Sequence, residues 1–137
     1  MDIKPYLFFN GTARDAVRMY ADIFGVPVPE MMTMKDAPEG MDIPSERRDW
    51  VMHCEMKIGG GGIYLSDDFA NNSAPMDGSS LMVSLPTARE AKRVFDDLAN
   101  GGDIRMPWEP TFWSAGFGTL TDKFGIRWMV GTDEPPK

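Results

Sequence analysis

Two segments of the chain share one pattern of apolar and polar positions. Residues 12–25 read "TARDAVRMYADIFG" and residues 87–101 read "TAREAKRVFDDLANG", and the two align without gaps over their shared length. In both, apolar residues recur at the spacing of one face of an α-helix. The pattern therefore predicts two amphipathic helices whose buried faces are Ala13, Ala16, Val17, Tyr20, Ile23 and Phe24 in the first, and Ala88, Ala91, Val94, Phe95 and Leu98 in the second.

The ends of both helices carry matching signals. Thr12 is followed three residues later by Asp15, and Thr87 is followed in the same way by Glu90. This spacing is typical of a capping box, in which the threonine hydroxyl accepts a hydrogen bond from a free backbone N–H. A glycine stands near the end of each helix, where a left-handed C-cap favours it. The sequence thus predicts the same capping for both helices.

Strand-like segments surround each helix in the same order. Their apolar, β-branched and aromatic residues alternate with small or polar ones, as in half-buried strands. The first set is 3–9, 27–33, 50–58 and 63–67, and the second set is 80–86, 103–108, 112–121 and 126–130. The chain is therefore a repeat of a βαβββ unit.

This repeat predicts an α+β fold. Module 1 covers residues 1–70, module 2 covers residues 79–131, and residues 132–137 form a flexible tail. Neither module alone buries both its helix and its sheet well, so we expect the modules to pair. We expect one curved mixed sheet with the helices on its convex side, in a single domain of the size that 137 residues allow.

The segment "WVMHCEMKIGGGGIYLSD" (50–67) holds the only histidine, the only cysteine and four consecutive glycines. A phosphate-binding loop needs a helix N-terminus behind its glycines. Here the glycines stand between two strand-like stretches and no Lys-Ser/Thr pair follows them. The glycines are therefore predicted to form a hairpin turn.

The strand before these glycines alternates cleanly. Trp50, Met52, Cys54, Met56 and Ile58 share one face, which we expect to pack on the helices. His53, Glu55 and Lys57 share the other face, and His53 and Glu55 lie about 7 Å apart along it. Cys54 is then a small buried side chain. His53 and Glu55 leave three interpretations open: metal ligands, an acid–base pair, or a solvated face.

Composition excludes several classes of function. A net charge of −7, without a basic stripe, disfavours binding to nucleic acid or to an anionic membrane. A single cysteine excludes an intrachain disulfide and any CxxC motif. No apolar run approaches the length of a membrane span, and the first residues lack the features of a signal peptide. We expect a cytoplasmic protein.

The repeat resembles the vicinal-oxygen-chelate superfamily, which includes glyoxalase I, extradiol dioxygenases and bleomycin-resistance proteins. Within it the chain looks most like the PhnB-like branch, through "KPYLFFNGTARDAVRMY", "MHCEMKIGGGGIYLSD", "TAREAKRVFDDLA" and "FWSAGFGTLTDKFGIRWMV". The resemblance implies the glyoxalase/bleomycin resistance/dioxygenase fold and a homodimer. Some sequences of this kind are labelled demethylubiquinone methyltransferases, but no Gly-rich loop between a strand and a helix is present to hold S-adenosylmethionine.

Metalloenzymes of the superfamily place His, Gln or Glu ligands on the first and last strand of each module. The matching positions here are approximately Pro5, Tyr64, Ser80 and Met129, and none is a usual ligand. We therefore expect no metal and no cofactor. A metal at this protein would need a non-classical site built on His53 and Glu55.

What remains is a cleft on the open face of the sheet. Strand parity assigns to it the ligand-binding candidates His53, Glu55, Tyr64, Trp113, Phe117, Arg127 and Met129. Such an aromatic, methionine-rich lining is typical of a small-molecule pocket, although Trp113, Phe117 and Trp128 are also candidates for the core or a dimer interface. The polar segment 35–50 is either a mobile lid or a disordered loop.

Three functions remain open. The first is a homodimeric, metal-free protein that binds a small organic molecule. The second is an isomerase- or lyase-like enzyme in which His53 and Glu55 are catalytic, with His53 as the general base and Glu55 orienting it. The third is an interaction module without a ligand.

Overall fold

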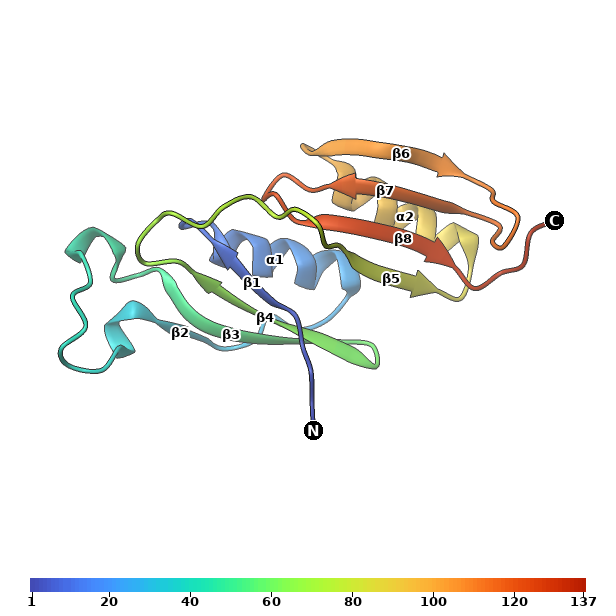
Figure 1. Cartoon of the computed structure of the whole chain (residues 1–137). Coiled ribbons are helices and arrows are strands. Elements are labelled where there is room, and N and C mark those ends of the chain that lie inside the picture. The colour runs from blue at the N-terminus through green and yellow to red at the C-terminus, as the bar shows by residue number, and fades with distance from the viewer. The chain divides into compact units, whose positions relative to one another are not determined.

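The computed structural model describes all residues from 1 to 137. The chain forms two compact units, Met1–Ala74 and Pro75–Lys137. Each unit contains one βαβββ repeat, which Figure 1 traces from the blue N-terminus to the red C-terminus.

The first unit holds one helix against a four-stranded sheet with the strand order β1-β4-β3-β2. β1 runs parallel to β4, and the other neighbouring strands are antiparallel. Its elements are β1 (Tyr6–Phe9), α1 (Ala13–Phe24), β2 (Met31–Thr33), two 3-10 turns (Met34–Asp36 and Ser45–Arg47), β3 (Val51–Ile58) and β4 (Gly61–Asp67).

The second unit repeats this topology. Its sheet has the order β5-β8-β7-β6, with β5 parallel to β8 and the remaining neighbours antiparallel. Its elements are β5 (Leu81–Leu85), α2 (Ala88–Ala99), β6 (Asp103–Glu109), β7 (Phe117–Thr121) and β8 (Arg127–Thr132). In each unit the first strand lies beside the last one.

The predicted α+β class and the doubled βαβββ order are confirmed. The strands hydrogen-bond as two four-stranded sheets, one in each unit, where we expected a single sheet. The reason is that β1 pairs with β4 and β5 pairs with β8, so each repeat completes a ladder of its own. Strand ends also shift: β1 begins at Tyr6, and β7 begins at Phe117 because residues 111–116 form a turn closed by Thr111 and Ser114.

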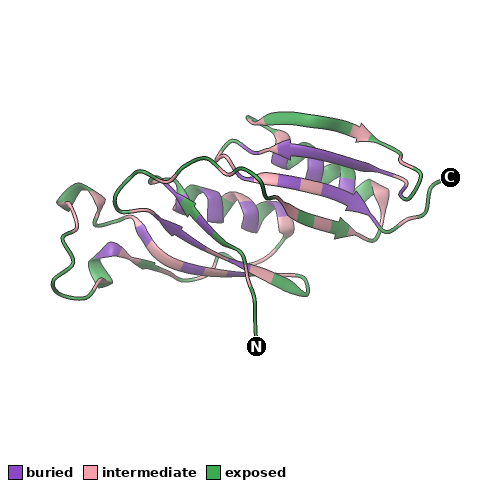
Figure 2. Cartoon of the chain, in the orientation of Figure 1, coloured by how far each residue is buried: buried purple, intermediate pink, exposed green.

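Both helices bury the faces that their apolar spacing predicts. In α1 the buried side chains are Ala13, Ala16, Val17, Tyr20, Ala21 and Ile23, and in α2 they are Ala91, Val94, Phe95 and Leu98. Phe24 and Ala88 lie at the margin of these faces and are only partly buried. Figure 2 shows the buried residues in purple along one side of each helix. Gly118 of β7 lets the Phe95 ring pack closely on the strand, because a Cβ at this position would lie 2.6 Å from the ring.

The two helices begin differently, although their sequences predict the same cap. The Thr87 hydroxyl accepts a hydrogen bond from the Glu90 N–H at 3.2 Å, as expected. Thr12 makes no such bond, so its predicted capping box is wrong. The carboxylate of Asp67, at the end of β4, accepts from the N–H groups of Gly11 and Ala13 at 2.9 and 3.0 Å. A charged acceptor brought in by the sheet satisfies these donors in place of the local hydroxyl.

The glycine run forms the predicted hairpin turn between β3 and β4. Gly59 has a φ of 55°, which lies in the left-handed region that glycine adopts at no steric cost. A Cβ on Gly62 would lie 2.7 Å from the Met56 carbonyl oxygen, so this position also needs a glycine. Neither helix of the chain is long and apolar enough to cross a membrane.

Candidate functional site

The open face of the first sheet is the face away from α1. Along β1, Leu7 and Phe9 are buried, whereas Tyr6 and Phe8 are exposed. The rings of Tyr6 and Phe8 stack with centroids 4.9 Å apart. Because side chains alternate along a strand, β1 presents two aromatic rings to the open face and two apolar side chains to the helix.

His53 lies on this open face, partly exposed, and contacts two tyrosines. The Tyr6 hydroxyl is 2.7 Å from His53 Nδ1, and the ring centroids of His53 and Tyr64 are 5.2 Å apart. Burial raises the pKa of the Tyr6 phenol above its usual value, so the phenol keeps its proton at neutral pH. The phenol donates to Nδ1 in the tautomer that leaves this nitrogen without a proton, and accepts from it in the other.

Glu55 is engaged by a cation. Its carboxylate lies 2.7 Å from Lys4 Nζ, and that ammonium also lies 5.2 Å from the centroid of the Tyr64 ring. The Lys4 hydrogen bond holds the pKa of Glu55 below its usual value. His53 is thus hydrogen-bonded to Tyr6, and the Glu55 carboxylate accepts a hydrogen bond from Lys4.

The alternation of β3 breaks near its start. Cys54 and Met56 are buried as expected, and burial raises the pKa of the Cys54 thiol to about 11. The ladder with β2 shifts register between Met32 and Thr33, opposite Val51 to His53. Val51 is fully buried as a result, and Met52, which we expected to face the helix, lines a hollow with Tyr6 and Phe8.

This hollow has a volume of about 580 Å³ and lies within the first unit. Its walls come from β1, β3, the end of β4, the loop after β4 and the connection between β2 and β3. They consist of aromatic and methionine side chains with a few oxygen-bearing groups: Tyr6, Phe8, Met34, Met41, Met52, Ser66, Asp67, Asp68, Phe69 and Ser73. We call it the unit 1 hollow.

The segment 35–50 supplies part of these walls through Met41. Two short 3-10 turns stand in this connection, and its two ends are joined by backbone bonds from Met34 N–H to the Trp50 carbonyl and from Lys35 N–H to the Arg48 carbonyl. The Arg47 guanidinium donates to the Phe69 carbonyl at 2.6 Å. The segment therefore has local structure and contacts the loop after β4, next to the hollow.

Asp67 is the buried carboxylate of the hollow. Only 3% of its surface is exposed, and it accepts a third backbone bond from Val51 N–H at 2.9 Å, in addition to the two at the start of α1. Burial raises the pKa of Asp67 more than these three bonds lower it. The group joins β3, β4 and α1 at one point.

In the second unit, the predicted site residues divide between core and surface. Phe117 is buried and meets the exposed Trp113 ring edge-on at 5.6 Å. Arg127 pairs with Asp77 at 3.1 Å, and its Nε is buried without a hydrogen-bond partner. Met129 is partly buried in β8 between Met82 and Thr119. Trp128, on the opposite side of β8, is buried and donates to Asp122 at 2.9 Å.

The predicted candidates thus form a cluster in the first unit and a separate group in the second. His53, Glu55 and Tyr64 lie together around Lys4 and Tyr6. Trp113 and Phe117 form an aromatic pair, and Arg127 and Met129 stand on β8. Their roles in ligand binding stay predictions.

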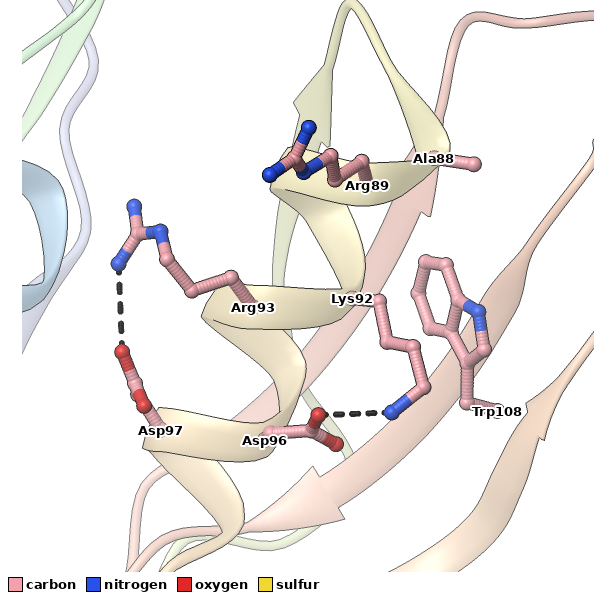
Figure 3. A pocket seen from close by; sticks show the side chains of 7 residues that line it. All are labelled: Ala88, Arg89, Lys92, Arg93, Asp96, Asp97 and Trp108. Atoms are coloured by element: carbon pink, nitrogen blue, oxygen red, sulfur yellow. Dashed lines mark hydrogen bonds and ion pairs between the residues drawn. The ribbon is translucent and has the colours of Figure 1, made fainter.

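A second hollow lies beside α2, between the helix and Trp108 of β6 (Figure 3). Its charges largely pair within the helix, Lys92 with Asp96 at 2.7 Å and Arg93 with Asp97 at 3.2 Å. Such pairs are typical of a solvated helix face and contribute little energy. This surface offers no set of converging groups for chemistry.

The chain brings no three His, Cys, Asp or Glu side chains together in a group that could hold a metal ion. At the positions where the superfamily carries its ligands, this chain has Pro5, Tyr64, Ser80 and Met129. His53 is hydrogen-bonded to Tyr6, and Glu55 is hydrogen-bonded to Lys4. Neither partner is among the His, Cys, Asp and Glu side chains that usually bind zinc.

Sequence reasoning missed most of the unit 1 hollow. The sequence did not predict which face Tyr6 and Phe8 share, because "YLFF" (6–9) is apolar or aromatic at every position and shows no alternation. Met34, Met41 and Phe69 come from connections whose paths no periodicity predicts. The one available signal was the pair Asp67-Asp68 directly after a strand, since acidic residues there stand at the edge of the sheet.

The chain is similar to a known protein family and to a known protein over almost its whole length. A family model described as 3-demethylubiquinone-9 3-methyltransferase matches residues 1–131. Protein YjdN of Escherichia coli is 34% identical over 141 residues, which cover 95% of this chain and 94% of YjdN.

Solved structures of similar proteins share this fold. Protein PA1353 from Pseudomonas aeruginosa is 36% identical with a TM-score of 0.87, covering 98% of both chains. The PhnB protein from Bacillus cereus, a putative 3-demethylubiquinone-9 3-methyltransferase, is 28% identical with a TM-score of 0.77, covering 96% of this chain and 99% of its own. A glyoxalase/bleomycin resistance protein from Albidiferax ferrireducens shares the fold at 12% identity, with a TM-score of 0.63 and coverage of 96% and 98%.

The residues do not fit the methyl donor that the family description implies. The glycine run lies in the hairpin between β3 and β4 and has no helix behind it. In the turn from β1 to α1, Gly11 is the single glycine, and a Cβ there would lie 2.8 Å from the Trp50 ring, so that glycine serves packing. By its match and its relatives, the chain belongs to the family described as 3-demethylubiquinone-9 3-methyltransferase, the PhnB-like branch of the vicinal-oxygen-chelate superfamily.

Proposed function

We propose that this protein binds a small organic molecule without a metal ion and that the unit 1 hollow is its binding site. The observation that carries the proposal is the hollow itself, about 580 Å³ in volume and walled mainly by aromatic and methionine side chains. Ligand pockets in proteins have volumes of roughly 300–1,000 Å³ and are lined mostly by apolar groups with a few polar ones.

The chemistry of the lining supports binding. Methionine side chains are flexible and polarisable, and they adapt to ligands of irregular shape. The Ser66 hydroxyl donates to the Met52 carbonyl at 2.8 Å, and Asp67 is saturated by backbone N–H groups. These polar groups are occupied in holding the walls, so they do not act as a nucleophile and its base.

We do not propose the isomerase- or lyase-like reaction. That reaction needs Glu55 to orient His53, but Lys4 holds the Glu55 carboxylate at 2.7 Å. The Tyr6–His53 hydrogen bond instead fixes the ring of Tyr6, which lines the hollow. In this proposal His53 positions a wall of the site.

A thermal-shift screen of small organic molecules tests the binding proposal. Compounds that stabilise the wild type should lose at least half of their shift in Phe8→Ala, because that variant removes an aromatic wall that packs on no helix. Val28→Ala, at a side chain that is 52% exposed between α1 and β2 and outside the lining of the hollow, is the control and should keep the shifts. Shifts that survive Phe8→Ala and fall in Val28→Ala would contradict the assignment.

We also infer that the protein forms a homodimer. The edge strand β6 exposes Ile104 and Met106, and the following turn exposes Phe112 and Trp113. Apolar side chains on and beside an unpaired strand edge favour association with another copy. Sedimentation equilibrium at micromolar concentration should give twice the mass of one 15.3 kDa chain, and a monomer would contradict the inference.

A further inference from the structure

The charged residues that line the unit 1 hollow are all acidic. Asp67 and Asp68 contribute carboxylates, and no Lys, Arg or His side chain takes part in the lining. The hollow therefore carries a negative charge in walls that are otherwise apolar. Such a surface favours a ligand of opposite charge and disfavours an anion.

The two carboxylates differ in burial and in their hydrogen-bond partners. Asp67 is buried, and its oxygens hold the N–H groups of three backbone positions. Asp68 is half-buried, and its oxygens accept from Ala70 N–H at 3.0 Å and from the Ser73 hydroxyl at 2.9 Å. The Ser73 hydroxyl lowers the pKa of Asp68 from its usual value, so this carboxylate is ionised at neutral pH. Asp68 is the charge with oxygen lone pairs left for a ligand.

The aromatic walls of the hollow also favour a positively charged ligand. Tyr6 and Phe8 are stacked with ring planes 9° apart, and Phe69 lines the hollow from the loop that begins at Asp68. The face of an aromatic ring attracts a cation, most strongly when water is excluded. Polarisable methionine sulfurs at Met34, Met41 and Met52 suit the same kind of guest.

A cation close to Asp68, Arg47, is already engaged by other groups. Arg47 donates to the Phe69 carbonyl at 2.6 Å, and its guanidinium lies 5.2 Å from the centroid of the Trp50 ring. Arg47 helps to lower the pKa of Asp68, but as the smallest of its causes, and the side chain does not line the hollow. It does not place a positive charge in the ligand space.

We propose that the unit 1 hollow selects organic cations, with an alkylated or protonated amine held between the aromatic rings of Tyr6, Phe8 and Phe69 and the carboxylate of Asp68. The inference rests on the proposed function and adds the charge of the ligand to it. The net charge of −7 works in the same direction, because it raises the local concentration of cations around the protein.

Three probes with one aromatic body test the charge preference. Benzyltrimethylammonium, benzyl alcohol and benzoate should be titrated into the full-length protein by isothermal calorimetry at low salt. We expect the cation to bind about tenfold more tightly than the alcohol, and the anion to bind more weakly than both. Added salt should lower the affinity for the cation and leave the affinity for the alcohol unchanged.

Three variants locate the effect. Asp68→Asn keeps the size of the side chain and removes its charge, so the affinity for benzyltrimethylammonium should fall about fivefold while benzyl alcohol changes less than twofold. Asp22→Asn removes the same charge from the exposed side of α1 and should change neither affinity. Phe8→Leu keeps an apolar wall without a ring face and should lower the affinity for the cation alone, by about threefold.

The outcomes separate the two proposals. If no probe binds the wild type at millimolar concentration, the proposed binding function is overturned and this inference falls with it. If the alcohol or benzoate binds as tightly as the cation, the binding function stands and the charge preference is wrong. If Asp22→Asn weakens the cation as much as Asp68→Asn does, the cation is held by the general field of the protein, and the assignment to the hollow is wrong.

Discussion

The two units repeat one topology and yet secure their helices in different ways. In the first unit, Asp67 at the end of β4 accepts hydrogen bonds from Gly11 and Ala13 at the start of α1. Thr132 occupies the matching position at the end of β8, since Phe9 pairs with Asp67 as Leu85 pairs with Thr132. The Thr132 hydroxyl donates to the Leu85 carbonyl and does not cap α2.

In the second unit the start of α2 is satisfied by two other groups. Thr87 accepts from Glu90 N–H, and the Glu134 carboxylate accepts from Ala88 N–H at 3.0 Å. The same Thr-x-x-acid signal therefore gives a local cap only where the sheet does not supply a stronger acceptor. A capping motif in the sequence therefore shows only that a side-chain cap can form. Whether it forms depends on the acceptors that the neighbouring strand brings to the start of the helix.

The largest expected effect tests the core of the second unit, which was predicted from the repeated helix pattern. Phe95 is 2% exposed between α2 and β7, so Phe95→Asp removes the ring from a packed site and leaves a charge there. We expect the free energy of unfolding to fall by about 4 kcal/mol or more, measured by chemical denaturation. Val28→Asp, at an exposed side chain between α1 and β2, should change it by less than about 0.5 kcal/mol. Equal effects for the two variants would mean that the repeat-derived core is wrong.

The next effect concerns the cap that the sequence did not predict. Asp67→Ala leaves the N–H groups of Gly11, Ala13 and Val51 without their acceptor. The free energy of unfolding should fall by about 3 kcal/mol, because buried donors without partners are costly. Asp67→Asn keeps one carbonyl oxygen for two of these donors and should lie between the wild type and Asp67→Ala. A loss below about 0.5 kcal/mol in Asp67→Ala would show that water replaces the carboxylate.

A smaller effect separates the two threonines. Thr87→Ala removes a side-chain cap and should lower the free energy of unfolding by about 1 kcal/mol. Thr12→Ala removes an exposed hydroxyl that caps nothing, so it should lower that free energy by less than about 0.5 kcal/mol. Urea denaturation of both variants beside the wild type checks the difference. Matching losses would restore the symmetry that the repeated sequence predicts.

The smallest effect depends on pH and belongs to the open face of the first unit. Lys4 lowers the pKa of Glu55 in the folded protein below its usual 4.5. A carboxyl whose pKa falls on folding stabilises the protein above its unfolded pKa, and this contribution is lost as the pH falls through the folded pKa. Glu55→Gln should therefore lower the melting temperature slightly at pH 7, and this deficit should shrink as the pH falls below 4.5. A deficit that is the same at pH 3 as at pH 7 would show that packing, and not charge, is responsible.

Much of the fold could be predicted from the sequence because its signals are local. Apolar residues at helical spacing fix the buried faces of α1 and α2, and the glycine run between two alternating stretches fixes the β3–β4 hairpin. The open-face cluster of His53, Glu55 and Tyr64 followed from strand parity, because β3 and β4 are regular where these residues stand. Their partners Tyr6 and Lys4 did not follow, since the parallel pairing of β1 with β4 joins segments more than fifty residues apart.

By itself, the sequence determined the doubled βαβββ order and the faces of its helices, because propensity and periodicity act within a few residues. Only the tertiary structure decided that Asp67 caps α1, that Met52 leaves the helix-facing side, and that Met41 and Phe69 wall a hollow with Tyr6 and Phe8. Each of these depends on a strand register or on the path of a connection. Registers and paths are set by contacts between distant segments, which the pattern within one segment does not record.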